Sequence, residues 1–489
     1  MSIREPEDRA RRARDVLPAM DRHPMTDARA LDPRVAAPVD VVRRPATTWR
    51  SPAWPVFLIG FALLGLGLLI GPRVPDRDAG YNCVGNIYLR GPFGFSLNCD
   101  SPEFMWLARD PAGLVDHVNS RQSRPGLILL AAAIQAPLSL VLPPDGPPVP
   151  VYQGLYDPLR VAQSVIQDRP AYVAYILLNV AILLMSFVAL RLAIERDQPV
   201  RSTSAAVIVA ATGVLLIAND VTKAFFWSPH TQMFNILVPV LAVYATRQVV
   251  LRGRLDRHFA LVMGAVIGLG MTAYPVFAVI AACMLPPALV GMLRETSWVA
   301  RRRGVVNLAI LLALTALPLA LWYVYVRATT GGFFNAELDL HQVVWMKDAL
   351  ARGLGVFLAQ WFGYLAELLV FAAPQMLGLA TLIVWLVASA VVAIRTRRVA
   401  PKNLASAVPM IITGLYVSCA VLGFYTCVGW ITDRLAYPMI PPLVIAAGAT
   451  AVAIAQRLAP WPRAVLAGGC LAVAAAQVIY EVVKLGPWS

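Results

Sequence analysis

The sequence predicts an all-α polytopic membrane protein, with about eleven transmembrane helices and two further apolar helices that do not cross. Hydrophobic residues make up 58% of the 489 residues, and charged residues only 14%. A soluble domain of this length would be about a quarter charged. The apolar residues gather in runs of roughly 17 to 23, separated by short polar links. The alternating short strands of an outer-membrane barrel are absent from the pattern.

The positive charges point to membrane orientation rather than to a nucleic-acid partner. The net charge is +14, but the arginines cluster in the first 50 residues and in a few links between apolar runs. That distribution is typical of cytoplasmic segments under the positive-inside rule, and it argues against nucleic-acid binding. Residues 1–50 are polar and lack an apolar face, so we expect a disordered cytoplasmic tail before a transmembrane domain over 51–489.

Three strongly basic links set the predicted topology: 246–258, 294–304 and 395–402. Holding them in the cytoplasm places the N-terminus inside and the C-terminus outside. The expected spans are 54–70, 171–193, 204–218, 231–247, 259–272, 274–293, 305–327, 375–394, 404–425, 434–456 and 463–482.

Two apolar stretches, 126–142 and 355–371, do not fit this topology. The first is broken by Gln135 and Pro137, and the second follows a polar segment. If both crossed the membrane, the basic links between them would move to the outside, which the charge rule disfavours. We therefore expect re-entrant or interfacial helices on the outer side, the first of them within a large first outer loop over 72–170.

Cysteines and metal-binding motifs give little chemistry. Cys83 and Cys99 both lie in the first outer loop, where an oxidising exterior permits a disulfide; two unpaired thiols are the alternative. The five histidines are scattered without metal-ligand spacing. No nucleotide-binding loop or nucleophile elbow occurs. We predict no cofactor and no metal site, although these motifs do not exclude that a divalent metal takes part in the protein's function.

Two acids in the first outer loop, Asp100 and Glu103, are the first candidate catalytic residues. They are three positions apart and share a face of any helix that starts at Ser101-Pro102. Phe104, Met105 and Leu107 would let that helix lie on the membrane. The structural alternative is that Asp100 only caps the helix and Glu103 is a solvated first-turn acid.

Other ionisable residues gather on the same predicted face. They are Arg121, Arg124, Asp220, Lys223, His230, Asp433 and Arg434. Arginines at an outer lipid boundary run against the charge rule, so they either hold a phosphate or anchor the protein by snorkelling. For Arg434, the structural alternative is a salt bridge with Asp433.

These pieces together resemble the GT-C superfamily of integral membrane glycosyltransferases. The matching residues are Asp100 in "NCDSPEF", Asp220 in "ANDVTK", and Arg434, Tyr437 and Pro438 in "DRLAYPMIPP". The chain departs from the pattern because its first loop has no adjacent Asp-Glu pair. Either Asp100 or Glu103 would therefore take the catalytic place.

The resemblance implies transfer of a sugar from a polyprenyl-phosphate donor to a glycan, lipid or protein acceptor. It implies a site on the extracytoplasmic face, and the Ala-, Arg-, Pro- and Leu-rich composition favours a bacterial inner membrane. One carboxylate would act as the base in an inverting displacement, and partial desolvation would raise its pKa.

Each site residue then has an expected role. Asp100 is the expected base and Glu103 its substitute, while Arg434 would hold the donor phosphate. Lys223, His230 or Arg124 would assist Arg434, and Arg121 would contact the donor phosphate. Asp220 and Tyr437 would bind donor or acceptor, although an aromatic residue at Tyr437 also suits the membrane interface.

Two other functions remain in competition. A transporter or lipid flippase would place ionisable residues in the middle of its spans, whereas here they gather on one face, which favours an enzyme. A lipid-linked polysaccharide polymerase or ligase would depend on His230 or His341 rather than on Asp100.

Overall fold

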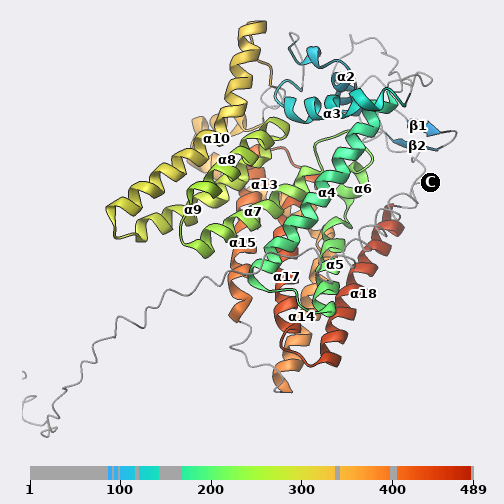
Figure 1. The fold of residues 1–489 in the computed structure, drawn as a ribbon, viewed down its shortest axis with the longest axis vertical. Helices are drawn as coiled ribbons and strands as arrows, with labels where there is room; N and C mark the ends of the chain where they lie inside the picture. Colours follow the sequence, from blue (N-terminus) through green and yellow to red (C-terminus); the bar gives the residue numbers. More distant parts are fainter. Residues whose placement is uncertain are drawn as a thin grey trace, which may run out of the picture. The chain divides into compact units, whose positions relative to one another are not determined.

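The computed structural model describes residues 86–90, 93–96, 100–115, 121–142, 168–335, 342–396 and 405–485. These residues form a helical membrane protein (Figure 1). The predicted tail over 1–50, the first span over 54–70, Cys83, Cys99 and His341 lie outside the described residues.

Within the described part of the chain, nine helical segments are long and apolar enough to cross a membrane. They are α4 (Arg169–Asp197), α7 (Phe234–Arg252), η4 with α9 (Pro275–Arg294), α10 (Trp298–Thr330), α13 (Leu354–Gln375), α14 (Leu377–Arg395), α15 (Val408–Val428), α16 to α17 (Asp433–Ala455) and α18 (Pro460–Leu485). The chain is thus a polytopic helical membrane protein, as its composition predicts.

Shorter elements complete the fold. They are β1 (Asn86–Arg90), β2 (Phe93–Ser96), α2 (Ser101–Arg109), η3 (Pro111–Val115), α3 (Pro125–Leu138), α5 (Thr203–Ile217), α6 (Asp220–Phe225), α8 (Arg257–Ala273), α12 (Val344–Arg352) and η6 (Tyr437–Met439). β1 and β2 pair antiparallel, with Asn86 opposite Ser96. The all-α prediction misses this hairpin because a two-stranded pair is too short to show in an apolar pattern.

Capping residues fix where several helices begin. Asp168 accepts the Ala171 N–H at 3.0 Å at the start of α4, and Asn219 accepts the Thr222 N–H at 2.9 Å at the start of α6. Asp256 caps α8 through the Phe259 N–H at 2.8 Å. These side chains satisfy N–H groups that have no partner inside the helix.

Small residues let α8 and α10 approach closely, as is common between membrane helices. A Cβ atom added to Gly264 would lie 2.8 Å from Leu314 Cβ, and one added to Gly268 would clash with the Leu314 carbonyl oxygen. Most of α10 faces outward, since only 11% of the residues in its most apolar stretch are buried. Its exposed face is suited to lipid.

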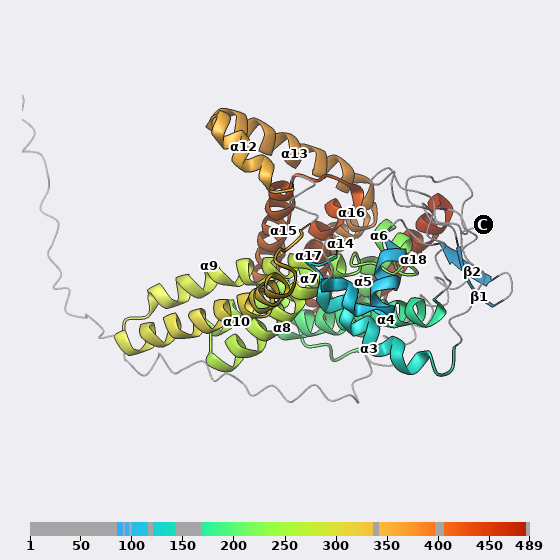
Figure 2. The ribbon, with the colours of Figure 1, turned by 90° about the horizontal axis from the view of Figure 1, so that it is seen from above.

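The helix lengths bear on the two stretches that did not fit the predicted topology. α3 has 14 residues and is too short to span. α13 has 22 residues, longer than expected and sufficient by length and composition to cross. However, Glu367 lies within α13 and is exposed, and a carboxylate facing lipid is costly. An interfacial position for α13 stays our prediction; Figure 2 shows α12 and α13 projecting from the other helices.

Candidate active site

The site is built around Asp100, at the start of α2. The Ser101 hydroxyl hydrogen-bonds to the Ser228 hydroxyl at 2.8 Å, and the Tyr175 hydroxyl donates to the Phe104 carbonyl at 2.9 Å. These contacts fasten α2 to α4 and to the segment after α6. Phe104 is fully buried, so α2 is anchored in the core rather than lying loosely on a surface.

The segment after α6 is positioned by polar groups of α4. The Asn179 amide donates to the carbonyls of Phe225, Phe226 and Ser228 at 3.2, 2.8 and 3.1 Å. The Tyr172 hydroxyl donates to the Trp227 carbonyl at 2.7 Å. Together they hold the turn that presents His230. Asn179 is not among the residues predicted from the sequence, although a lone asparagine in a long apolar run is a signal of a buried polar contact.

Asp100 takes part in an ion-pair cluster with Arg121, Glu103 and His230. Arg121 Nη2 lies 2.6 Å from Asp100 Oδ1, and Arg121 Nε donates to Glu103 Oε2 at 3.1 Å. His230 Nε2 lies 2.9 Å from Asp100 Oδ2. Asp100 occupies the N-cap position of α2 without a side-chain cap hydrogen bond. The capping alternative therefore does not explain its carboxylate.

The hydrogen bonds of His230 define its tautomer. Its Nδ1 accepts the Gln232 backbone N–H at 3.1 Å, so Nε2 carries the proton and donates to Asp100. The ring is 2% exposed and packs against Phe104 and Phe225, with centroid distances of 5.7 and 5.0 Å. With both nitrogens engaged, His230 orients the carboxylate and has no lone pair left for a substrate proton.

Electrostatics keep Asp100 ionised and His230 neutral. Burial favours the protonated form of Asp100, but the Arg121 charge, the His230 hydrogen bond and the Arg434 charge outweigh it and hold the pKa well below its usual range. Burial lowers the pKa of His230 to about 4, against the opposing effect of the Asp100 carboxylate. The prediction that the pKa of Asp100 is raised is wrong. That prediction considered the desolvation of the carboxylate but not the guanidinium of Arg121 that pairs with it.

Arg434 lies in the same cluster, at the start of α16. Its Cζ is 5.8 Å from the centroid of the Phe225 ring, which itself contacts His230. The Asp433 carboxylate accepts the Arg434 backbone N–H at 2.7 Å, and the guanidinium makes no ion pair with it in the described structure. Among the residues that the structure describes, the buried Nε of Arg434 has no hydrogen-bond partner. Arg434 therefore supplies an uncommitted cation beside Asp100.

Arg124 also reaches this region, from the start of α3. Its Nη1 lies 3.4 Å from Thr231 Oγ1, next to His230, and its Cζ is 5.4 Å from the centroid of the Tyr274 ring. Its backbone N–H donates to the Arg121 carbonyl at 2.8 Å. These contacts place Arg124 near Arg121 and His230, as a further cationic group of this region.

Lys223 and Asp220 belong to a neighbouring cluster formed by α6 and α18. Lys223 Nζ donates to the Glu481 carbonyl at 2.7 Å, and Gln477 Nε2 donates to Glu481 Oε1 at 2.7 Å. Burial lowers the pKa of Lys223, while the charges of Glu481 and Asp220 oppose the shift. Lys223 is thus committed to α18.

Tyr437 is a core residue. Its side chain is 1% exposed and its hydroxyl donates to the Leu216 carbonyl. That bond ties η6 to the end of α5, just before the cap of α6. Of the nine candidate site residues, Tyr437 is the most enclosed by protein.

Comparisons with known proteins leave the family unassigned. No protein-family model matches the chain, and neither the curated proteins nor the solved structures contain a match. The resemblance to membrane glycosyltransferases stays a prediction. Among the described residues, no group of three or more His, Cys, Asp or Glu side chains could hold a metal ion.

Proposed function

We propose that the protein is a membrane glycosyltransferase that moves a sugar from a polyprenyl-phosphate donor to an acceptor hydroxyl. One observation carries this proposal: Asp100 and Arg434, far apart in the sequence, lie in one cluster around His230 and Phe225. A carboxylate and an uncommitted guanidinium in one cluster are the two groups that attack at a sugar phosphate requires.

The proposed reaction is a direct displacement at the anomeric carbon. The acceptor oxygen forms a bond to that carbon, and the bond from the carbon to the phosphate oxygen breaks. The phosphate leaves with the bonding electrons, and the acceptor proton passes to the Asp100 carboxylate. One displacement inverts the anomeric centre. Arg434, aided by Arg124, stabilises the charge that grows on the departing phosphate.

The low pKa of Asp100 makes it a weak base that stays ionised in acid. Such a base suits a transition state with oxocarbenium character, in which the leaving bond breaks before much proton transfer. About a third of the Asp100 side chain is exposed, so it remains reachable. Arg121 and His230 are positioning residues in this proposal, and Glu103 shares Arg121 with Asp100.

The position of the cluster supports a lipid-linked donor on the outer face. α7 begins just after His230 and ends at Arg252, in a predicted cytoplasmic link. The two ends of this one helix therefore separate the cluster from the basic links. Two buried ion pairs, Arg191–Glu195 and Arg247–Asp197, likewise involve the ends of α4 and α7 that lie away from the cluster. A transporter would place such charges in the middle of its spans.

The test is transfer by the purified protein in lipid nanodiscs. A panel of polyprenyl-phosphate-linked hexoses and pentoses is supplied with hydroxyl acceptors, and free polyprenyl phosphate is measured by mass spectrometry. We expect release with at least one donor. Arg434→Gln should lower kcat/KM by about 10²-fold, in line with removal of one charge-stabilising donor. Arg352→Gln, in an exposed part of α12, is the matched control.

Two results would contradict the proposal. One is no release from any donor while the protein in proteoliposomes moves a labelled donor across the membrane, which would make it a flippase. The other is release that Arg434→Gln and Arg352→Gln reduce equally.

A further inference from the structure

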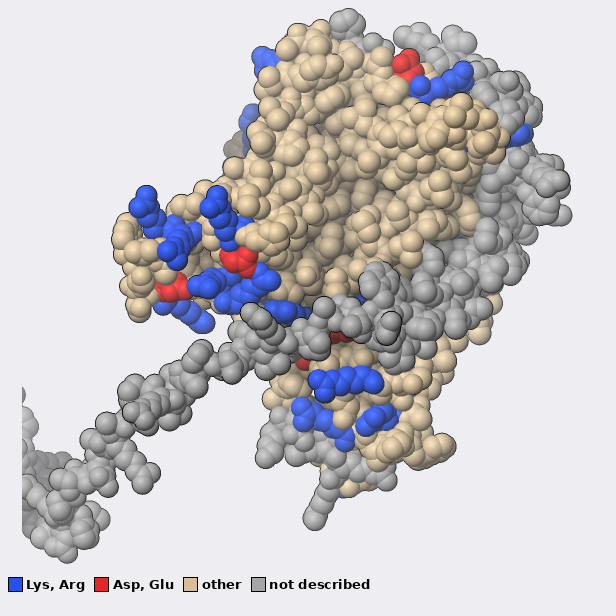
Figure 3. Space-filling model, in the orientation of Figure 1, with Lys and Arg blue, Asp and Glu red and all other residues tan. Residues whose placement is uncertain are grey.

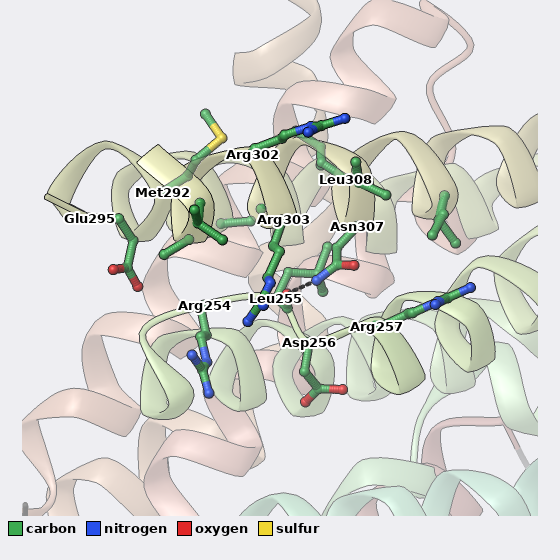
Figure 4. Close-up of a pocket in the computed structure, with 16 residues that line it drawn as sticks. Arg254, Leu255, Asp256, Arg257, Met292, Glu295, Arg302, Arg303, Asn307 and Leu308 are labelled. Atoms are coloured by element: carbon green, nitrogen blue, oxygen red, sulfur yellow. Dashed lines mark hydrogen bonds between the residues drawn. The ribbon is translucent and has the colours of Figure 1, made fainter. Parts of the chain in front are cut away.

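A cavity lies away from the Asp100 cluster, at the basic ends of α8, α9 and α10. It encloses about 700 Å³ and lies between the link before α8, the end of α9 and the start of α10 (Figure 4). Figure 3 shows the matching gathering of Lys and Arg side chains on the surface. The proposed glycosyl transfer makes no use of this cavity.

The cavity is rich in arginines without partners. Arg254, Arg257, Arg302 and Arg303 line it, and none of their guanidinium groups makes a hydrogen bond or ion pair within the described structure. Two acids, Asp256 and Glu295, also line the cavity. The two oxygens of Asp256 accept from Arg252 and from the Phe259 N–H. Four arginines against two carboxylates leave the lining with an excess of positive charge. Figure 4 shows Arg303 reaching from α10 toward Arg254 and Leu255.

The walls of the same cavity are apolar. Ala288, Met292, Val306, Leu308 and Ile310 contribute to the lining. Its shape is held by the Asn307 amide, which donates to the Leu255 carbonyl at 2.8 Å and joins α10 to the link before α8. A small inorganic anion needs only the guanidinium groups. The combination of guanidinium groups and aliphatic walls fits an amphipathic anion.

The membrane around the cavity contains amphipathic anions, namely anionic phospholipids. The cavity adjoins α10, whose side chains are largely exposed, and its arginines belong to the two basic links predicted to face the cytoplasm. That leaflet carries the anionic lipids, and basic pockets between membrane helices bind their head groups. Guanidinium forks match the geometry of a phosphate.

We propose that this cavity binds the phosphate head group of an anionic phospholipid from the cytoplasmic leaflet. Arg254 and Arg303 hold the phosphate, Arg257 and Arg302 add charge at the rim, and the apolar walls take the glycerol and the first part of the acyl chains. The bound lipid would fix the link before α8 against α10.

Native mass spectrometry of the full-length protein tests this site. Phosphatidylglycerol and phosphatidylcholine with the same acyl chains are titrated into wild-type protein and into Arg254→Gln/Arg303→Gln. We expect tight binding of phosphatidylglycerol to the wild type, at least about 10-fold weaker binding to the variant, and little binding of phosphatidylcholine. Arg294→Gln/Arg395→Gln is the matched control, because it removes two exposed arginines that do not line the cavity.

Three results would overturn the proposal. The first is equal loss of phosphatidylglycerol binding in both double variants, which would indicate general surface attraction. The second is unchanged binding in Arg254→Gln/Arg303→Gln with an unchanged unfolding temperature. The third is displacement of the lipid by inorganic phosphate at concentrations similar to that of the lipid, which would indicate a site for free phosphate.

Discussion

The two arginine-rich regions of this protein are built in opposite ways. Around Asp100, the side chain of Arg121 is only 11% exposed, and its guanidinium is paired with the carboxylates of Asp100 and Glu103. Around the cavity at α8 and α10, Arg254 and Arg303 are exposed, and their guanidinium groups make no ion pair with any described residue. Paired, buried charges orient each other and set pKa values. Unpaired, exposed charges attract a mobile anion. The contrast separates a site suited to chemistry from one suited to holding lipid.

Among the residues that surround Asp100, the largest expected effect comes from removing the charge of Arg121. Arg121→Gln should lower kcat/KM by about 10²-fold or more at acid pH, because burial then raises the pKa of Asp100 and the base becomes protonated. The wild type should keep its activity as the pH falls from 7 to 5. Arg109→Gln is the control: it removes an exposed arginine of α2, the helix that begins after Asp100, and should keep the wild-type pH profile. Identical profiles for all three proteins would show that Arg121 does not control Asp100.

The next effect is a pH dependence of stability that comes from His230. Its folded pKa of about 4 lies below its ordinary value near 6.5. The unfolded state therefore binds more protons between these values, and stability present above pH 6.5 is lost as the pH falls toward 4. His230→Gln keeps a donor toward Asp100 but does not titrate. We expect the drop in unfolding temperature from pH 7 to 4.5 to be about 2–4 °C smaller in this variant than in the wild type. An equal drop in both proteins would show that His230 does not cause the pH dependence.

A smaller effect should follow from loosening the turn that carries His230. Asn179→Ala removes the amide whose two N–H groups are shared by three buried carbonyls. The Phe225 carbonyl still accepts the Ser228 N–H, whereas those of Phe226 and Ser228 lose this donor. We expect a loss of about 1–3 kcal/mol in stability together with reduced kcat. Ser186→Ala is the control on the same helix, because its hydroxyl bonds only to the Ile182 carbonyl one turn earlier. Chemical denaturation and the transfer assay measure both quantities, and equal effects of the two substitutions would contradict this role of Asn179.

The smallest effect concerns Tyr437, which the sequence motif placed among the binding residues. Tyr437→Phe removes its hydrogen bond to the Leu216 carbonyl and should cost about 1 kcal/mol. The KM for the sugar donor should stay unchanged, because the ring is buried in the core. A KM raised several-fold at unchanged stability would return Tyr437 to the binding site.

The sequence predicted the fold class better than the site. Long apolar runs predict helices because a lipid interior forces the backbone to satisfy its own hydrogen bonds. The extra length of α13 and the β1–β2 hairpin were not predicted, because hydropathy marks neither the ends of a helix nor a pair of short strands. Asp100, Arg121, His230 and Arg434 could each be flagged by residue type and predicted side of the membrane.

Their pairing could not be predicted, because the contacts between α2, α6 and α16 are tertiary. The pKa of Asp100 shows the consequence. Desolvation can be guessed for a carboxylate at a membrane surface, but the sign of the shift depends on a guanidinium 2.6 Å away. The role of Asn179 likewise depends on a turn that folds back onto α4.

The most direct test of the central claim compares Asp100→Asn with Asp110→Asn in the nanodisc transfer assay. Asp110 is an exposed acid at the end of the same helix, and its substitution changes the net charge equally. We predict that Asp100→Asn lowers the rate of polyprenyl phosphate release by about 10²- to 10⁴-fold, with an unfolding temperature close to that of the wild type, while Asp110→Asn releases it normally. Wild-type release by a folded Asp100→Asn protein would contradict the assignment of Asp100 as the catalytic base.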